Sequence, residues 1–385
     1  MFIDIACSQK KKYNQNAYGD YFSSNRFPNM NRVVAVLSDG LGSGIKANIL
    51  ACMTSTMLLK FMENHFDIEK SCEIIMNSLP VCKVRGISYS TFSAIDCFED
   101  GKTKIVEEGN PDFIWIRNGE VLKPEFQIIQ SKDFKNRKMK VYNIQLEKYD
   151  RIIFCSDGAT QVAMGTKQYP LGLERGGLIK IILNKLEQEP VISSQKLSNY
   201  LVNQIRLIAP NRELKDDTSI VSLYCRDPRE SLIFTGPPYH QEKDSYFAKF
   251  FMDFKGKKAI SGGTTANIIS RELNIPVIAR LSTNAGKLPG LSEMKGVDLV
   301  TEGILTLTKT LEYLETGKFE ENAAKSLMEF LLDSDEIHFL VGAQMNKAHY
   351  DPNLPVEIEI RKNIIKQMAS VLEEKYLKKV NVQFV

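Results

Sequence analysis

The stretch "VVAVLSDGLGSGIKANIL", residues 33–50, decides how the first part of the chain is read. Five apolar residues lead into Ser38-Asp39-Gly40, glycines alternate over 40–44, and a helix-like run follows. This order predicts a buried strand, a turn at the rim of a sheet and a helix. The helical run over 45–62 is apolar around most of its circumference, which predicts a helix enclosed in a core. Two chemistries fit the turn: a glycine-rich cradle for a nucleotide phosphate, or a metal site built on Asp39.

Composition limits the class of protein. A chain of 385 residues is expected to form two domains, and 43% apolar with 25% charged residues is typical of a soluble globular protein. Lys plus Arg number 50 against 47 acidic residues, so no charge excess points to nucleic acid. The start "MFIDIACSQKKK" does not resemble a secretory signal, and no run is apolar enough for a membrane span. We therefore expect a cytoplasmic protein without membrane or nucleic-acid partners.

Seven cysteines are scattered along the chain without C-x-x-C spacing. This pattern predicts reduced thiols and neither a zinc site nor a disulfide framework.

The hydrophobic pattern changes near residue 228. Residues 1–227 are strand-rich with two long helical patterns, whereas short apolar strands alternate with helices over 228–385. The polar stretch "RDPRE" at 226–230 separates the two parts. The alternation of strands and helices over 228–385 is typical of βαβ units, so we expect a second, α/β domain with a mainly parallel sheet.

Aspartates recur at the ends of expected strands. Asp39 lies in "VLSDG", Asp157 in "FCSDG", the pair Asp216–Asp217 in "KDDTSIV", and Asp20 in "YGDYF" before the first strong strand. An Asp-Gly pair places a carboxylate at the sheet rim, and we expect its glycine to turn with a positive φ that leaves the carbonyl accessible. Carboxylates that converge from several strands form an oxygen-rich site suited to Mg²⁺ or Mn²⁺.

The order of these motifs resembles one family. The motifs are "GD" (19–20), "SDGLGSGIKA" (38–47), "GNPDFIWIRNGEV" (109–121), "FCSDGATQ" (154–161) and "KDDTSIV" (215–221). Together they resemble the PPM, or PP2C-like, serine/threonine phosphatases, and most of all their bacterial SpoIIE-type branch, over about residues 1–225. The resemblance implies an α+β fold, an αββα β-sandwich with flanking helices and a two-metal site at one end. The chain departs from the family at "EKYDRIIF", where a Gly-Asp turn is usual, and at Gln161, where the branch often has Glu.

The resemblance also implies a set of metal ligands. Asp39 would bridge two Mn²⁺ or Mg²⁺ ions, the Gly40 carbonyl would bind one of them, and Asp20 would complete that ion's shell. Asp157 and Asp216 would hold the other ion together with Asp39. Asp39, Asp157 and Asp216 are thus the expected catalytic residues.

Asp217 would lie behind the ligands or at the periphery. The implied reaction is hydrolysis of phosphoserine or phosphothreonine on a partner protein, since two metal ions activate a water molecule and no protein nucleophile is required. Phosphorylated antagonists of bacterial anti-sigma factors are the substrates that the branch suggests. The sequence has no cysteine followed six positions later by arginine and no G-x-S-x-G motif, and "GKT" at 101–103 is expected to be a turn.

Two other functions remain open. A regulatory or binding protein could keep the phosphatase scaffold with weak or no catalysis. A dinucleotide enzyme using "GLGSG" ranks last, because the region where its acidic residue should follow is the middle of a helix. Lys46 and Ser43 either steer phosphate or line a solvated loop. The four histidines (65, 240, 338, 349) lack metal-pair spacing, and His338 is expected to be a half-buried strand residue.

The second domain has two strand–turn–helix segments of similar design. In "KKAISGGTTANIISREL", a helix N-terminus could bind a small phosphorylated or carboxylated ligand at Gly262, Gly263, Thr264 and Thr265, or a threonine could simply cap the helix. "DLVTEGILTLTK" repeats the design, with Thr301 as the expected cap. This domain matches no family that we recognise, and a homodimer is an open alternative.

Overall fold

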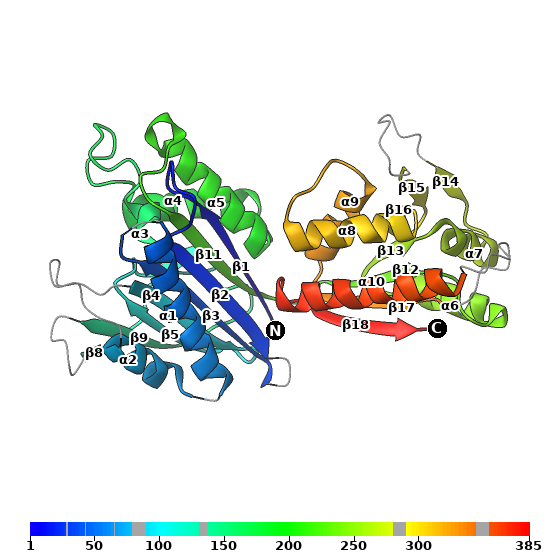
Figure 1. Ribbon diagram of the computed structural model, residues 1–385, viewed down its shortest axis with the longest axis horizontal. Coiled ribbons are helices and arrows are strands. Elements are labelled where there is room, and N and C mark those ends of the chain that lie inside the picture. The colour runs from blue at the N-terminus through cyan, green and yellow to red at the C-terminus, as the bar shows by residue number, and fades with distance from the viewer. Residues whose placement is uncertain are drawn as a thin grey trace. The chain divides into compact units, whose positions relative to one another are not determined.

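The computed structural model describes residues 1–27, 30–42, 44–64, 66–78, 90–130, 137–279, 290–343 and 354–385. The chain divides into two compact units, Met1–Asp227 and Pro228–Val385. Each unit has its own sheets and helices and is described by itself (Figure 1).

Two antiparallel sheets form the first unit. The six-stranded sheet has the order β2-β3-β4-β5-β9-β8, and the five-stranded sheet has the order β1-β11-β10-β6-β7. The strands of the first are β2 (Asp20–Phe27), β3 (Arg32–Gly40), β4 (Ser90–Phe98), β5 (Lys102–Glu108), β9 (Lys138–Gln145) and β8 (Gln127–Gln130). Those of the second are β1 (Phe2–Lys10), β11 (Thr218–Arg226), β10 (Arg151–Cys155), β6 (Ile114–Arg117) and β7 (Glu120–Leu122).

Helices cover the outer faces of this sandwich. On the six-stranded sheet lie α1 (Ile45–Glu63) and α2 (Ile68–Ser78), and one buried cluster joins them to β3, β4, β5 and β9. On the five-stranded sheet lie α4 (Glu174–Gln188) and α5 (Ser194–Ile208), which share a second cluster with β6, β10 and β11. A short helix, α3 (Asp157–Thr160), follows β10. The αββα arrangement of the PP2C-like fold, expected from the motifs, is therefore confirmed (Figure 1).

The apolar run of β3 is explained by burial on both faces. Val34 and Val36 pack in the cluster under α1 and α2. Val33, Ala35 and Leu37 alternate with them on the opposite face and are equally buried. A strand covered on both faces loses the alternation of polar and apolar residues, which is why "VVAVL" is continuous.

Helix α1 is not enclosed on all sides, so that expectation is wrong. Ala51 and Leu58 are fully buried against the sheet, but Ile45, Ile49 and Met53 are 70%, 51% and 51% exposed. These three residues recur every four positions and so form one outward apolar face. None of the helices in the described ranges is long and apolar enough to cross a membrane.

The second unit is built on a seven-stranded sheet in the order β14-β15-β16-β13-β12-β17-β18. Its strands are β12 (Glu230–Thr235), β13 (Lys257–Ser261), β14 (Val277–Ala279), β15 (Ser292–Met294), β16 (Val297–Thr301), β17 (Glu336–Val341) and β18 (Lys379–Phe384). Its helices are α6 (Asp244–Asp253), α7 (Gly263–Leu273), α8 (Ile304–Thr316), α9 (Ala323–Leu332) and α10 (Leu354–Glu374). The five strands from β16 to β18 are parallel and β15 is antiparallel to both of its neighbours, which confirms the mainly parallel α/β sheet.

The strand order places β12, the first strand, inside the sheet between β13 and β17. The chain adds β13 and β16 on one side of β12 and then returns to add β17 and β18 on the other side. Helices α6 and α7 pack on one face of the sheet, whereas α8, α9 and α10 pack on the other (Figure 1).

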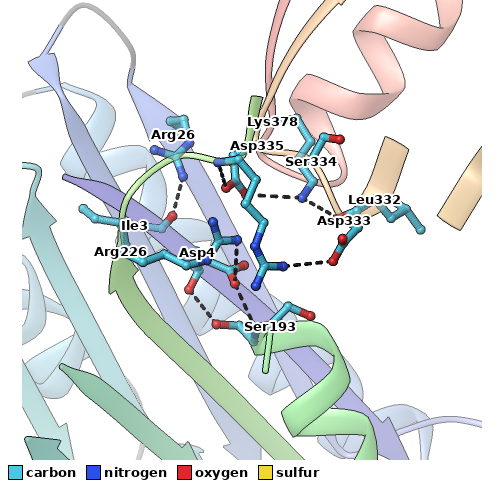
Figure 2. A network of polar contacts seen from close by, with 12 residues as sticks. Ile3, Asp4, Arg26, Ser193, Arg226, Leu332, Asp333, Ser334, Asp335 and Lys378 are labelled. Atoms are coloured by element: carbon cyan, nitrogen blue, oxygen red, sulfur yellow. Dashed lines mark hydrogen bonds and ion pairs between the residues drawn. The ribbon is translucent and has the colours of Figure 1, made fainter. Parts of the chain in front are cut away.

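Charged pairs tie down the chain where it leaves one unit and enters the next. In the first unit, the Arg226 guanidinium lies 3.2 Å from the Asp4 carboxylate (Figure 2). In the second unit, the Arg229 backbone N–H donates to the Asp335 carboxylate at 2.7 Å, and its guanidinium pairs with Asp333 at 2.9 Å. Only residues 227 and 228 separate the two arginines.

Candidate functional site

Two of the predicted site residues face each other across neighbouring strands. Asp20 opens β2 and Asp39 stands next to last in β3, and the antiparallel register pairs these two residues directly. Side chains that are paired in this way lie on the same side of a sheet, only about 5 Å apart at Cβ. Two like charges at this separation destabilise the sheet unless a proton or a cation lies between them.

Asp20 is held by one oxygen and leaves the other without a partner. The Ser219 hydroxyl donates to Asp20 Oδ2 at 2.6 Å. Asp20 Oδ1 is buried and has no hydrogen-bond partner among the described residues, and the residue is 2% exposed. Burial raises the pKa of the Asp20 carboxyl to about 6, although the hydrogen bonds from Ser219 and Ser156 act in the opposite direction. The Asp20 carboxylate is thus held in place through Oδ2, whereas its Oδ1 lacks a hydrogen bond.

Asp39 stands in the field of three other carboxylates. Burial raises the pKa of its carboxyl to about 9, and the charges of Asp20, Asp157 and Asp216 add to the shift. The pKa of Asp216 is also raised, by burial first and then by Asp157. These mutual effects mean that the four aspartates, which come from four separate segments of the chain, lie together in one acidic site.

Asp157 and Asp216 lie at the ends of adjacent strands of the five-stranded sheet. Asp157 begins α3 directly after β10, and its Oδ2 accepts a hydrogen bond from the Gln161 side chain at 3.1 Å. Asp216 lies in the exposed turn before β11, where its Oδ1 accepts from the Asp217 backbone N–H at 3.0 Å. Gln161 therefore orients Asp157 at the position where the branch often carries Glu.

Asp217 uses both of its oxygens to hold the backbone. Oδ2 accepts from the Gly19 N–H at 2.6 Å and Oδ1 accepts from the Lys12 N–H at 2.9 Å. A Cβ at Gly19 would lie 2.9 Å from Oδ2, so a larger residue there would displace the Asp217 carboxylate. Asp217 fixes the segment that leads into Asp20.

The glycines of the two "SDG" motifs do not have positive φ, so that expectation is wrong. A Cβ at Gly40 would overlap the Ala47 carbonyl oxygen at the start of α1. A Cβ at Gly158 would overlap the Asp217 carbonyl oxygen. Both glycines are required because two backbones approach closely, and this approach brings Asp39 toward α1 and Asp157 toward the Asp216–Asp217 turn.

The sequence analysis missed two polar residues that support the site. Ser219 lies in the quoted "KDDTSIV" motif, but a serine in a strand gives no sign that it binds Asp20. Asn110 donates to the Leu37 carbonyl at 3.4 Å and accepts from the Thr91 hydroxyl at 2.6 Å. Because Thr91 is paired with Asp39, Asn110 fixes the strand beside it.

The remaining polar candidates that fall within the described residues are exposed or half-buried. Lys46 is exposed on α1, and Ser43 lies outside the described residues. His338 is half-buried in β17 and contacts the Phe254 ring, as expected, and His240 is exposed. His65 and His349 lie outside the described residues.

The chemistry of the acidic site fits a hard divalent cation. All of its donors are oxygen atoms, and the buried Oδ1 of Asp20 lacks a partner that a cation would supply. Within the described ranges, no group of three or more His, Cys, Asp or Glu side chains is arranged to hold a metal ion. The four aspartates therefore lie near one another, but no three of them are already arranged to hold an ion.

In the second unit the structure brings the predicted glycines and Thr301 to one sheet edge. The Gly262 N–H donates to the Thr301 carbonyl at 2.9 Å, and a Cβ at Gly303 would lie 3.7 Å from Gly262 Cα. Thr301 does not cap α8, because it is the last residue of β16 and the N-cap is Gly303. Helix α7 is likewise capped by Gly262, not by a threonine, and neither helix has a side-chain cap.

Comparison with known families gives one match. The family model described as Stage II sporulation protein E (SpoIIE) matches residues 29–226. The Stage II sporulation protein E of Bacillus subtilis (strain 168) is 24% identical over 193 residues, which cover 49% of this chain and 22% of that protein. The chain thus spans less than a quarter of the length of this relative.

Solved structures with a similar fold come from several phosphatases. The phosphatase domain of SpoIIE from Bacillus subtilis, crystallised without domain swapping, has a TM-score of 0.44 and 19% identity, over 58% of this chain and 92% of that chain. The S. agalactiae serine/threonine phosphatase has a TM-score of 0.42 and 15% identity, over 58% and 100%. RsbX in complex with magnesium has a TM-score of 0.41 and 20% identity, over 58% and 94%.

Proposed function

Because this chain belongs to the SpoIIE family, whose domain is a PP2C-like phosphatase, we propose that it is a Mn²⁺- or Mg²⁺-dependent protein phosphatase. Its substrate would be phosphoserine or phosphothreonine on a partner protein. The observation that carries the proposal is the direct pairing of Asp20 with Asp39, with a buried Asp20 oxygen that no described residue satisfies.

The proposed ligands are Asp20, Asp39, the Gly40 carbonyl, Asp157 and Asp216. When bound, two such ions lower the pKa of a water molecule and offset the charge of the phosphate group. The chain's own residues position these ligands. Ser219 fixes one oxygen of Asp20, so that the other is directed away from the hydrogen bond. Gln161 restrains Asp157 in the same way.

The acidic site also needs a rigid frame. Asp217 ties Gly19 to the turn before β11, and thereby fixes the approach of β2 to β11. Asn110 is hydrogen-bonded to Thr91 of β4 and to Leu37 of β3, and so holds together the two strands at Asp39. Residues that hold ligands in this indirect way contribute about 10–100-fold to metal affinity or activity in metal sites.

The test is hydrolysis of p-nitrophenyl phosphate and of phosphoserine or phosphothreonine peptides with Mn²⁺. Asp39→Asn should lose activity by more than about 100-fold, because it removes a ligand and not only a supporting residue. Glu120→Gln is the matched control, since it makes the same carboxylate-to-amide change on an exposed hairpin. Metal-loaded wild-type protein that hydrolyses none of the substrates would contradict the proposal.

The rival function is a regulatory protein on a phosphatase scaffold. One observation favours it: no group of three metal-binding side chains in the described residues is already arranged to hold an ion. Calorimetry with Mn²⁺ separates the two functions. Saturable binding that Asp39→Asn abolishes supports the phosphatase, and the absence of binding supports the rival.

A further inference from the structure

The three central strands of the second unit end in a row of buried hydroxyl residues. The parallel register pairs Thr235 of β12 with Ser261 of β13, and Ser261 with Thr301 of β16. Ser261 and Thr301 both donate to the Glu302 carbonyl oxygen, at 3.0 and 3.1 Å. Thr235 Oγ1 is fully buried and has no hydrogen-bond partner among the described residues. A buried hydroxyl without a partner is costly, so this one requires an explanation.

Thr235 lies at the point where the strand order reverses. Its strand, β12, has β13 on one side and β17 on the other, and the chain leaves these strands in opposite directions. In open parallel sheets, ligands bind at the carboxyl ends of the strands at such a point. The backbones meet closely here: the Gly342 N–H donates to the Thr235 carbonyl at 2.8 Å, and a Cβ at Gly342 would overlap the carbonyl oxygens of Gly236 and Pro237.

A positive charge lies on the same face of the sheet as the Thr235 hydroxyl. Ile233 packs in the cluster that contains Ile365 of α10, and Thr235, two residues later on the strand, shares that face. Arg361 is one turn before Ile365, and a Cβ at Gly236 would lie only 2.5 Å from its Nη1. Glycine next to Thr235 therefore lets a guanidinium approach the strand end. Arg361 also has an interaction of its own.

The N-terminus of α7 is less suited to an anion. The exposed Glu302 carboxylate oxygens would lie 3.9 and 4.0 Å from a Cβ at Gly263, in the first turn of α7. A negative charge there already complements the helix dipole and repels a second anion. Thr265 of α7 and Thr306 of α8 also have buried hydroxyls without a partner among the described residues. Because Glu302 lies beside the start of α7 and Arg361 beside the end of β12, an anion is favoured at Thr235.

We propose that the second unit binds a small molecule carrying a phosphate or carboxylate group at the carboxyl end of β12. Thr235 Oγ1 donates a hydrogen bond to the anionic group, and the Arg361 guanidinium balances its charge. This site is independent of the acidic site in the first unit and of any phosphatase activity.

The test is calorimetric titration of the full chain after removal of metal by chelation and dialysis, so that phosphate cannot bind through metal in the first unit. The probes are AMP and pyrophosphate for the phosphate class, and citrate and succinate for the carboxylate class. We expect one class to bind saturably at millimolar concentration or below. Asp39→Asn should leave this binding unchanged.

Two variants test the residues. Thr235→Val should weaken binding about 5–10-fold, and Arg361→Gln at least about 10-fold, as expected for the loss of a neutral and of a charged hydrogen bond. Thr310→Val is the matched control, because its hydroxyl is equally buried but donates to the Thr306 carbonyl at 2.8 Å, with the Ala324 carbonyl as a second acceptor in reach of the same proton. It should bind with wild-type affinity.

Stability without ligand supplies a second readout that does not depend on choosing the right probe. Thr235→Val should leave hydrogen exchange in β12 as slow as in wild type or slower, because it removes an unsatisfied hydroxyl. Thr310→Val should make hydrogen exchange in α8 faster, because it removes the hydrogen bonding of the Thr310 hydroxyl to the Thr306 and Ala324 carbonyls. No binding of any probe at millimolar concentration would overturn the proposal, as would wild-type affinity in Thr235→Val. Either result would mean that the partner of the Thr235 hydroxyl is a buried water molecule and not a ligand.

Discussion

Replacing Asp39 with asparagine should stabilise the metal-free protein. Asp39 is paired with Asp20 and lies in the field of Asp157 and Asp216, which together with burial raise its pKa to about 9. Because the folded-state pKa is above the ordinary value of 3.8, the folded chain binds this proton more tightly than the unfolded chain. The stabilisation that the Asp39 carboxyl contributes to the folded state is fully present below pH 3.8, and it is lost as the pH rises toward 9.

The magnitude follows from the width of this pH window. Between pH 3.8 and pH 7 the protein loses this stabilisation over about three pH units. At 1.36 kcal/mol per unit, the free energy of unfolding falls by at most about 4 kcal/mol. The repulsion is shared with Asp20, so we expect Asp39→Asn to recover about 2 kcal/mol in the absence of metal. Mn²⁺ should reverse the order of stability, because a ligand at 100 times its dissociation constant adds about 2.7 kcal/mol to the wild type.

The assay uses urea unfolding followed by tryptophan fluorescence. Trp115 is the single tryptophan of the chain and is 9% exposed in β6, so its signal reports on the first unit alone. With a slope of about 2–3 kcal/mol per molar urea, the expected gain shifts the midpoint by about 0.7–1 M. The difference between variant and wild type should grow from pH 5 to pH 8.

Glu120→Gln, on the exposed hairpin between β6 and β7, is the control and should follow the wild type at every pH. The reasoning is refuted if metal-free Asp39→Asn unfolds at the same or a lower urea concentration than wild type. A difference that does not depend on pH would refute it as well.

Three further predictions concern other buried groups of the first unit. Gly40→Ala should cost about 2 kcal/mol or more in urea unfolding, because its methyl group would overlap the Ala47 carbonyl oxygen. Arg32→Ala should cost about 3–5 kcal/mol in the same assay, since it leaves the buried Asp96 carboxylate without the two hydrogen bonds at 2.6 and 2.9 Å. Burial raises the pKa of Glu107 to about 8, so wild-type stability should fall between pH 4.5 and 8, and Glu107→Gln should be about 2 kcal/mol more stable at pH 8.

Each of these predictions has an outcome that would contradict it. Wild-type stability in Gly40→Ala would mean that α1 moves away at no cost. A loss below about 1 kcal/mol in Arg32→Ala would mean that water reaches Asp96, as at an exposed ion pair. An unchanged pH profile in Glu107→Gln would mean that this carboxyl titrates normally in the folded protein.

The sequence predicted the fold of the first unit because its signals are local and its motif order is specific. The "VVAVL" strand is found where its residue types place it. Strand β1 was not expected, because "FIDIACSQK" becomes a strand only by pairing with β11, more than 200 residues later. Such a pairing has no local signature in one sequence.

The details of the site depend on contacts that a single sequence does not reveal. The two "SDG" glycines were expected to have positive φ, but the neighbouring Ala47 and Asp217 carbonyls are what exclude a side chain. The role of Ser219 depends on a partner 199 residues away. Thr301 was expected to cap a helix because threonine favours that position, yet glycine takes it at the sheet edge.

The charged pairs on either side of residues 227 and 228 also affect how the two units can be separated. A protease needs a stretch of accessible chain that can be drawn into its cleft, and such stretches are usually exposed loop tips. Arg226 is held by Asp4 (Figure 2). Arg229 is held by Asp333 and Asp335, so only residues 227 and 228 lie between the two held arginines. Digestion is therefore a poor route to the isolated units. A gene fragment for the second unit should begin early enough to keep Arg229, because that residue belongs to the unit's own fold.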